Sequence, residues 1–310
     1  MFSTMLTVGH QIIILFILIG VGIISKKAGF LNETVVKGMN NIVLYFVTPC
    51  LMMVSFQRDK DPALTKGLIV ATIAAFASHF LAILLAHLVI HDKDRATELI
   101  LRFGVIFGNC GFMTLPIQQA ILGPDGVFYG AMFIAVFNVI LWTYGLKTMS
   151  AGEEKITLRK LILNPGIIGM LLGLILFLTQ FRFPEVVEAP IEYIAGLNVP
   201  VPMFIIGYYL GSMKWKDLTK NPKQYLSIAL RLIAVPLLTM AVMIPFHVDP
   251  TVFVAITIGS CSPVAAKAVM FATKYDKNPE LGSEMVSVST LLSLITMPVM
   301  ISLGEVLAKV

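Results

Sequence analysis

Long apolar runs separated by short charged loops are the feature that most constrains this chain. Each run is about 20 residues long, the length at which a helix crosses the hydrocarbon core of a bilayer. Only 13% of the 310 residues are charged, about half the share of an average soluble domain. The runs are apolar all round, whereas a helix on the surface of a soluble protein keeps a polar face. The sequence therefore predicts an all-α integral membrane protein.

Ten membrane-spanning helices are expected. The predicted spans are residues 8–24, 35–56, 67–90, 98–121, 126–148, 164–180, 190–212, 223–246, 251–274 and 284–307. Lys and Arg gather in those loops that face the cytoplasm if both termini lie outside, which sets the expected orientation. Nothing basic precedes the first run, so it is expected to be a retained helix and not a signal peptide. This pattern suits a multi-pass protein of the cell membrane, such as a bacterial inner membrane.

Prolines recur in corresponding spans of the two halves. Pro49 in the second span matches Pro202 in the seventh, and Pro116 in the fourth matches Pro263 in the ninth, at nearly the same offset. Because each half has five spans, an odd number, the second half must enter the membrane with the opposite orientation. The predicted inverted repeats are residues 1–150 and 151–310. Inverted repeats with interrupted helices in matching positions are typical of secondary transporters.

The fourth and ninth spans are expected to be broken. Proline removes one backbone donor, and Gly108 and Gly111 loosen the helix ahead of Pro116. In hydrocarbon the freed backbone groups must find partners or line a wet cavity. Two half-helix N-termini at the bilayer centre, one near Pro116 and one near Pro263, favour an anion. The alternative is that each proline only kinks its helix.

Polar residues near these breaks are the candidate substrate ligands. A charged residue inside a span costs roughly 2.5–3.5 kcal/mol on insertion scales and indicates function. Lys267 is such a residue, although its side chain could also snorkel towards the inner surface. Asn109 and Asn138 could either bind substrate or bond a neighbouring helix. The residues expected to bind substrate are Asn109, Thr114, Asn138, Ser262 and Lys267.

Other ionisable residues carry less information. Arg102 and Arg231 lie nearer to span ends or loop charges, where snorkelling or a fixed ion pair is the favoured interpretation. The aspartates all lie in loops, and Glu192 is expected to mark the start of the seventh span. Proton and sodium sites usually use buried carboxylates, and the predicted spans offer none near the breaks. The coupling ion therefore cannot be identified from the sequence. The predicted site is neutral to positive, which suits an anionic substrate.

Several classes of function lack their motifs. The chain contains no H-E-x-x-H, no G-x-S-x-G and no phosphate-binding loop, and its three cysteines lack metal-ligand spacing. The sequence also has no basic stripe with interleaved aromatic residues, the pattern that would indicate nucleic-acid binding. We therefore expect no enzyme activity, no cofactor, no metal and no nucleic-acid partner.

Four stretches together resemble the auxin efflux carrier family, which includes plant auxin exporters and bacterial transporters similar to malate and malonate permeases. These stretches are Phe107–Pro116, Phe137–Trp142, Phe271–Tyr275 with the preceding Pro263, and Ser289–Pro298. The resemblance covers almost the whole chain. Plant members typically have glutamine where Asn138 stands, lack a counterpart of Lys267, and often have a longer central loop. These departures favour a bacterial-type member.

The resemblance implies a fold similar to that of bile acid sodium symporters. Spans 1, 2, 6 and 7, with Pro49 and Pro202, would form a scaffold that is often dimeric. Spans 3–5 and 8–10 would form a mobile transport domain. Substrate would lie near Asn109 and Asn138, where spans 4 and 9 cross, and would move by an elevator-like shift.

The predicted function is secondary transport of a small organic anion across the lipid bilayer by alternating access. Malate, malonate or an auxin-like acid would suit the site, with a proton or sodium as the possible coupling ion. The alternatives are a sodium-coupled symporter of larger organic anions and a membrane sensor that keeps the fold without transporting.

Overall fold

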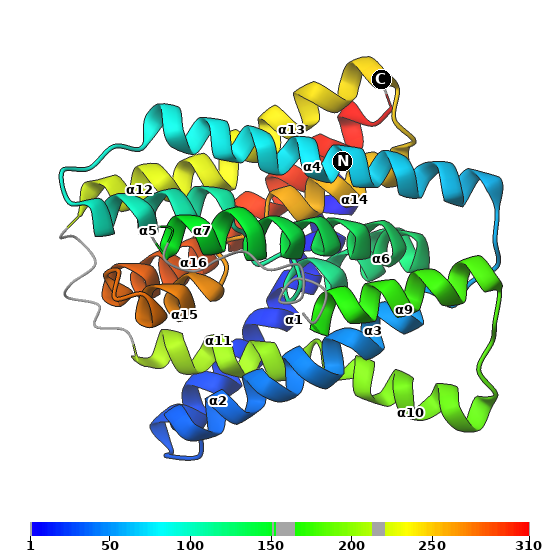
Figure 1. Cartoon of the computed structure of the whole chain (residues 1–310), viewed down its shortest axis with the longest axis horizontal. Coiled ribbons are helices and arrows are strands. Elements are labelled where there is room, and N and C mark those ends of the chain that lie inside the picture. The colour runs from blue at the N-terminus through cyan, green and yellow to red at the C-terminus, as the bar shows by residue number, and fades with distance from the viewer. Residues whose placement is uncertain (1, 151, 153–164, 213–220, 310) are drawn as a thin grey trace.

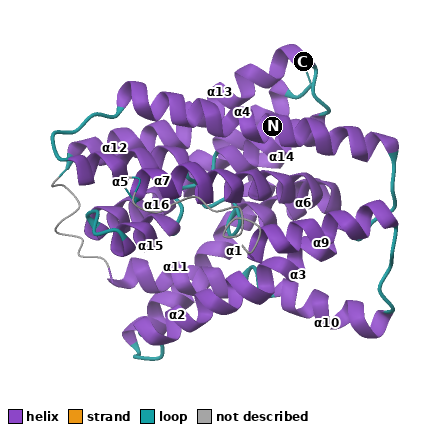
Figure 2. Cartoon of the chain, viewed as in Figure 1, coloured by secondary structure: helices purple, strands orange, loops and turns teal. Residues whose placement is uncertain are grey.

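Helices account for all the regular structure that the computed structural model describes, which covers residues 2–150, 152, 165–212 and 221–309. Over these residues no strand forms, as Figure 2 shows. A single antiparallel bridge joins Gly108 to Val264. The all-α prediction is therefore confirmed.

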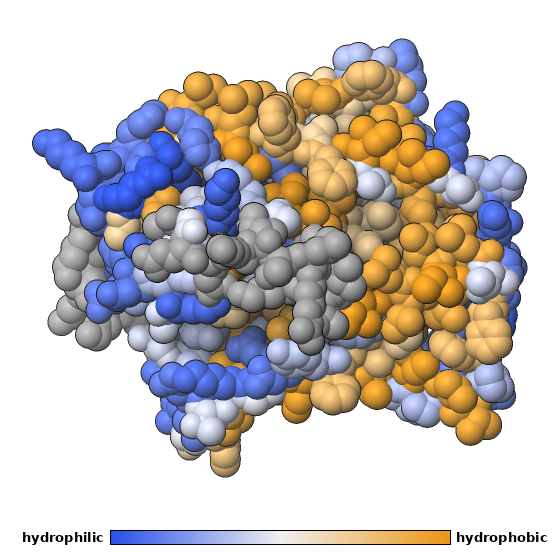
Figure 3. All heavy atoms as spheres, viewed as in Figure 1, coloured by the Kyte–Doolittle hydropathy of each residue, from blue (hydrophilic) through white to orange (hydrophobic). Residues whose placement is uncertain are grey.

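Six helical stretches in the described residues are long and apolar enough to cross a membrane. They are Glu33–Phe56, Pro62–Val89, Thr114–Met149, Glu185–Ser212, Pro222–Phe246 and Pro279–Leu307. Two shorter helices, α9 (Pro165–Thr179) and α14 (Pro250–Ser260), are apolar as well. On the face seen in Figure 3, hydrophobic side chains cover much of the surface between hydrophilic groups at its left end and right edge. These features agree with a multi-pass membrane protein.

The helices follow one another with short connections. Besides α9 and α14 they are α1 (Phe2–Lys27), α2 (Glu33–Ile42), α3 (Thr48–Phe56), α4 (Pro62–Val89), α5 (Arg95–Ile106), α6 (Thr114–Ile140), α7 (Leu146–Met149), α10 (Glu185–Gly196), α11 (Pro200–Ser212), α12 (Pro222–Ala229), α13 (Val235–Met243), α15 (Lys267–Lys274) and α16 (Pro279–Leu307). Three π-helical turns join α2 to α3, α6 to α7 and α12 to α13; they are Val43–Val47, Leu141–Gly145 and Leu230–Ala234.

An Asx-Pro pair starts four of these helices. Asp61, Asn221, Asp249 and Asn278 each occupy the N-cap, and each side chain accepts a backbone N–H of the first turn. Proline follows at the first helical position, where its missing N–H costs nothing. The loops that look like simple breakers in the sequence therefore also cap the helices that follow them.

The connections gather at two ends of the molecule, at the left and the right of Figure 1. At the left, Lys223 at the start of α12 donates to the Asp92 carboxylate between α4 and α5, at 2.8 Å. At the right, Arg182 before α10 bonds Asp59 between α3 and α4, also at 2.8 Å. The helices thus run between two polar ends, as expected for spans of one membrane.

Packing divides the helices into two neighbourhoods. In one, α1 lies along α11, and α3 lies against α9 and α10; in the other, α6 packs on α4 and α14, and α16 packs on α14 and α15. Glycines bring α1 and α11 together, since a Cβ on Gly22 would stand 2.6 Å from the carbonyl oxygen of Phe204. The described parts of α1 and α6 also contact each other across the two groups.

Two of the predicted spans are interrupted. Helix α5 ends at Ile106 and α6 begins at Thr114, while α14 ends at Ser260 and α15 begins at Lys267. Pro263 lies inside the second gap. Pro116, however, is the third residue of α6, so the chain leaves the helix before this proline and not at it. A proline in the first helical turn removes no helical hydrogen bond, and the same holds for Pro202 in α11. Pro49, in contrast, lies inside the continuous helical stretch Glu33–Phe56, directly after the π-helical turn Val43–Val47.

Candidate functional site

The two helix gaps lie against each other and pair through their backbones. The amide of Asn109 donates to the carbonyl of Pro263 at 2.6 Å, and the amide of Ala265 donates to the carbonyl of Phe107 at 2.9 Å. These bonds flank the Gly108–Val264 bridge. Backbone groups released by the two interruptions thus satisfy each other inside the protein, as burial requires. We call this region the crossover.

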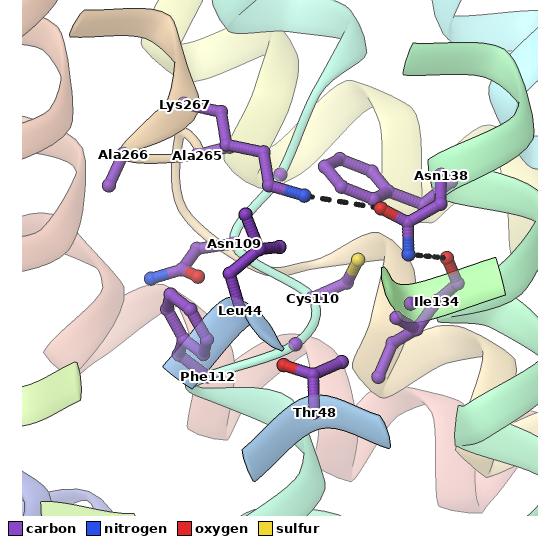
Figure 4. Close-up of a pocket in the computed structure, with 14 residues that line it drawn as sticks. Leu44, Thr48, Asn109, Cys110, Phe112, Ile134, Asn138, Ala265, Ala266 and Lys267 are labelled. Atoms are coloured by element: carbon purple, nitrogen blue, oxygen red, sulfur yellow. Dashed lines mark hydrogen bonds between the residues drawn. The ribbon is translucent and has the colours of Figure 1, made fainter. Parts of the chain in front are cut away.

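A small pocket opens beside the crossover, with a volume of 60 Å³ (Figure 4). Its walls are Leu44, Thr48, the stretch Gly108–Phe112, Ile134, Phe137, Asn138, Gly166, Ala265, Ala266 and Lys267. Three of the five predicted substrate ligands, Asn109, Asn138 and Lys267, meet here, although they come from three separate segments of the chain. The predicted break residues Gly108 and Gly111 line the same pocket.

Lys267 and Asn138 contact each other across the pocket. The Lys267 ammonium donates to Asn138 Oδ1 at 3.2 Å and lies 4.8 Å from the centre of the Phe137 ring. The Asn138 amide nitrogen in turn donates to the carbonyl of Ile134 at 3.0 Å, which fixes which way the side chain points. Figure 4 shows the lysine reaching across towards Asn138. The ammonium is therefore held at the pocket by an amide oxygen and an aromatic face.

The pocket has a positive character. Lys267 is the first residue of α15, so its charge adds to the positive end of that helix dipole. Within the part of the chain that the structure describes, no carboxylate forms an ion pair with it. Asn109 is 6% exposed, and its side-chain amide makes no hydrogen bond to another described residue. An anion entering the pocket would find a cation and an amide donor.

Thr114 and Ser262 do not line this pocket. The Thr114 hydroxyl donates to the carbonyl of Cys110, and the Ser262 hydroxyl donates to the carbonyl of Gly259 at 2.9 Å. Both side chains are buried and bond backbone at the ends of the helix gaps. A buried hydroxyl can donate its hydrogen bond to a backbone carbonyl of the same segment, and both of these side chains do so.

The two arginines have different roles. Arg102 forms an ion pair with Glu98 at 2.5 Å, so the prediction of a fixed ion pair is confirmed. For Arg231 the interpretation was wrong, since its side chain is 2% exposed and bonds backbone carbonyls of the crossover. An arginine within an apolar span, without a carboxylate nearby in sequence, was the signal that should have marked it.

Residues far away in sequence complete the pocket wall. Leu44 and Thr48 come from the π-helical turn after α2 and the start of α3, and Gly166 comes from α9. None of them carries a charge or belongs to a motif, so no feature of the sequence marks them as pocket residues. They show that the pocket lies between the two packing neighbourhoods.

A second, larger cavity of 700 Å³ lies along the first half of α6 and the last turns of α3 and α10. Gln57, Arg58 and Glu192 are among its polar lining, and Pro116 forms part of its wall. Asn198, which also lines it, donates to the carbonyl of Gly111 in the crossover at 3.3 Å. The crossover therefore has the small pocket at Asn138 and Lys267 and, beyond Gly111, this wider cavity.

Comparison with known proteins relates the chain to membrane transporters. The model of the family described as "Membrane transport protein" matches residues 7–301. An uncharacterized transporter of Methanothermobacter thermautotrophicus is 23% identical over 294 residues, which cover 93% of this chain and 96% of that protein. A second uncharacterized transporter, from Methanocaldococcus jannaschii, is 26% identical over 64% of this chain and 68% of its own length.

A plant protein is similar to part of the chain. Auxin efflux carrier component 8 of Arabidopsis thaliana is 26% identical over 158 residues, which cover 49% of this chain and 43% of the plant protein. The family match over nearly the whole length confirms the resemblance noted in the sequence. With its apolar helices, its paired helix gaps and these relatives, the chain belongs to the membrane transport protein family of the auxin efflux carriers and is a multi-pass membrane transporter.

Proposed function

We propose that this transporter carries a small organic anion, such as malate, malonate or an auxin-like acid, as a secondary transporter. The observation that carries the proposal is the Lys267 ammonium, which projects into a pocket between helices and has an amide oxygen as its hydrogen-bond partner. A cation in such a place, without a described carboxylate to balance it, is costly until an anion arrives.

The substrate carboxylate is proposed to bind between Lys267 and Asn109. The ammonium uses one of its three N–H groups on Asn138, and so has donors left for a ligand. Asn109 would donate its side-chain amide from the opposite break, and Asn138 would hold the lysine in place as well as contact the substrate. In the proposed mechanism the walls of the pocket separate as the substrate binds.

Movement of one helix group past the other supplies that separation in the proposed mechanism. Leu44, Thr48 and Gly166 belong to the proposed scaffold, spans 1, 2, 6 and 7, whereas Asn109 and Lys267 belong to the proposed transport domain, spans 3–5 and 8–10. An elevator-like shift would carry the second group of residues, with substrate, past the first. The antiparallel pairing of the two helix gaps supports the proposed inverted repeats, residues 1–150 and 151–310. In the same proposal, two copies of the scaffold would pack together as a homodimer.

Uptake into liposomes tests this function. Purified protein would be reconstituted and offered radiolabelled malate, with and without an imposed proton, sodium or voltage gradient. We expect saturable uptake that other small carboxylates compete, and the gradient that drives it identifies the coupling ion. Binding without flux under every gradient would instead support the sensor, and sodium-driven uptake of larger anions would support the symporter.

Lys267→Ala is the variant that tests the site. Removing a charged hydrogen-bond donor is expected to weaken substrate affinity by about 10- to 100-fold. Lys274→Ala is the matched control, because Lys274 lies at the other end of the same helix and does not line the pocket. Asn109→Ala should also weaken affinity. Normal uptake by both pocket variants would refute these residue assignments.

A further inference from the structure

Arg231 carries a buried charge that the proposed transport mechanism does not use. It lies in the π-helical turn Leu230–Ala234, between α12 and α13, and is 2% exposed. Among the described residues no carboxylate forms an ion pair with it. A guanidinium in hydrocarbon without a counter-ion is expensive, so its surroundings must compensate the charge in another way.

Backbone carbonyls provide that compensation. Arg231 Nε donates to the carbonyl of Ser262 at 2.9 Å, and Nη2 donates to the carbonyl of Ser260 at 2.8 Å and to the Ser262 hydroxyl at 3.1 Å. Nη1 donates to the carbonyls of Val105 and Ile106 at 3.4 and 3.3 Å. A guanidinium has five N–H groups, and these contacts offer five acceptors.

The acceptors belong to the C-terminal ends of two half-helices. Val105 and Ile106 are the last residues of α5, Ser260 is the last residue of α14, and Ser262 follows it in the gap. Each helix C-terminus carries about −0.5 elementary charge, so two of them roughly balance one guanidinium. The two helix C-termini therefore compensate the charge of Arg231. Among the described residues that line the pocket, Lys267 is the cation.

These contacts hold both gaps from a third, unbroken span. Asn109 follows α5 by three residues, and Lys267 begins the helix after the second gap. We infer that Arg231 is the positioning residue of the crossover: by binding the ends of α5 and α14 at once, it keeps Asn109 and Lys267 around one pocket. This role deepens the proposed function and rests on it as far as substrate affinity is concerned.

Arg231→Lys separates this geometry from charge. Lysine keeps the positive charge but has only three donors on one nitrogen, so it cannot bridge both helix ends as the planar guanidinium does. We expect a folded protein whose KM for radiolabelled malate rises about tenfold, roughly the effect of one lost charged hydrogen bond. Arg231→Gln loses charge as well as donors and is expected to raise KM further. Arg102→Lys is the matched control, because Arg102 is a buried arginine of the same helix group that pairs with Glu98.

Coupling to the pocket distinguishes positioning from a general loss of stability. If Arg231 acts through Lys267, the double variant Arg231→Lys, Lys267→Ala should bind little worse than Lys267→Ala alone. Additive effects on KM, or a KM unchanged by Arg231→Lys, would overturn the inference.

A second measurement needs no substrate. Hydrogen exchange of the backbone amides in Phe107–Met113 and Cys261–Ala266 should be at least about tenfold faster in Arg231→Lys than in wild type or in Arg102→Lys, because the helix ends lose their clamp. Unchanged exchange would overturn the inference. Failure of the wild type to transport any carboxylate would refute the proposed function instead, and the exchange result would then decide the role of Arg231 alone.

Discussion

Gly108→Ala is expected to destabilise the protein, because a methyl group at this position has no room. A Cβ on Gly108 would press on the Arg231 guanidinium, whose Cζ would stand 2.7 Å away, and on the Ser262 hydroxyl. Real Cβ atoms essentially never approach another atom within 3.0 Å. Arg231 cannot move aside without giving up its bonds to the ends of α5 and α14.

The expected loss of folding free energy has two sources, overpacking and a lost hydrogen bond, and a shift that relieves the first incurs the second. Overpacking a close-packed site costs about 1–3 kcal/mol, and losing a hydrogen bond from a charged donor costs about 1.5–3 kcal/mol. Since a shift of Arg231 would relieve the clash, we expect a loss of about 2–4 kcal/mol and not the full sum. This is a large fraction of the stability of an ordinary domain.

Gly111→Ala is the matched control for this prediction. Gly111 lies in the same gap three residues later, a Cβ there meets nothing within 4 Å, and neither glycine has a positive φ. Its substitution should change stability by less than about 0.5 kcal/mol. Both variants would be unfolded with denaturant in detergent micelles and followed by helical circular dichroism. Equal midpoints for the two variants would refute the reasoning about the crossover.

Two further predictions concern other parts of the molecule. Gly22→Ala should loosen α1 from α11 and cost about 1–3 kcal/mol, whereas Gly20→Ala, with nothing within 4 Å of its Cβ, should be neutral in the same denaturation assay. The hydrogen bond from Lys223 holds the pKa of Asp92 below its ordinary value of 3.8. The pair therefore stabilises the fold above that value and loses this contribution as the pH falls through the lowered pKa. Asp92→Asn should cost up to about 1 kcal/mol at pH 7 and become neutral once the wild-type carboxyl is protonated; a cost that persists in acid would contradict the pairing.

Hydropathy was enough to predict an all-α membrane protein, and the prolines pointed to the region of the crossover. Apolar runs that cross the bilayer form helices, because a helix satisfies the hydrogen bonds of its own backbone where no water is present. Asn109, Asn138 and Lys267 stood out because polar groups are rare in such runs. The exact helix ends did not follow from the prolines, since α5 ends at Ile106, well before Pro116. What ends it is the pairing of Phe107 and Asn109 with the other gap.

That pairing could not be derived from local sequence. The partners of Arg231 lie 126 and 31 residues away along the chain, and they are carbonyl groups, which every residue has. No residue type marks a carbonyl that a helix break will leave free. The same limit applies to Gly166 in the pocket wall, which owes its place to the packing of α9 and not to its own chemistry.

The three π-helical turns have a consequence for how this chain could change over time. Each holds one residue more than an α-helix needs, and each borders the crossover: Val43–Val47 includes the pocket residue Leu44, Leu141–Gly145 follows Asn138, and Leu230–Ala234 holds Arg231. Deleting that residue would restore a regular helix and leave the segments on its two sides in nearly the same relative orientation, whereas a deletion within regular helix would rotate one side by about 100°. A single-codon deletion there would leave the span intact and keep the side chains beyond the turn on the same face of the helix. Related transporters aligned to this chain should therefore place their rare gaps within membrane helices at these three turns.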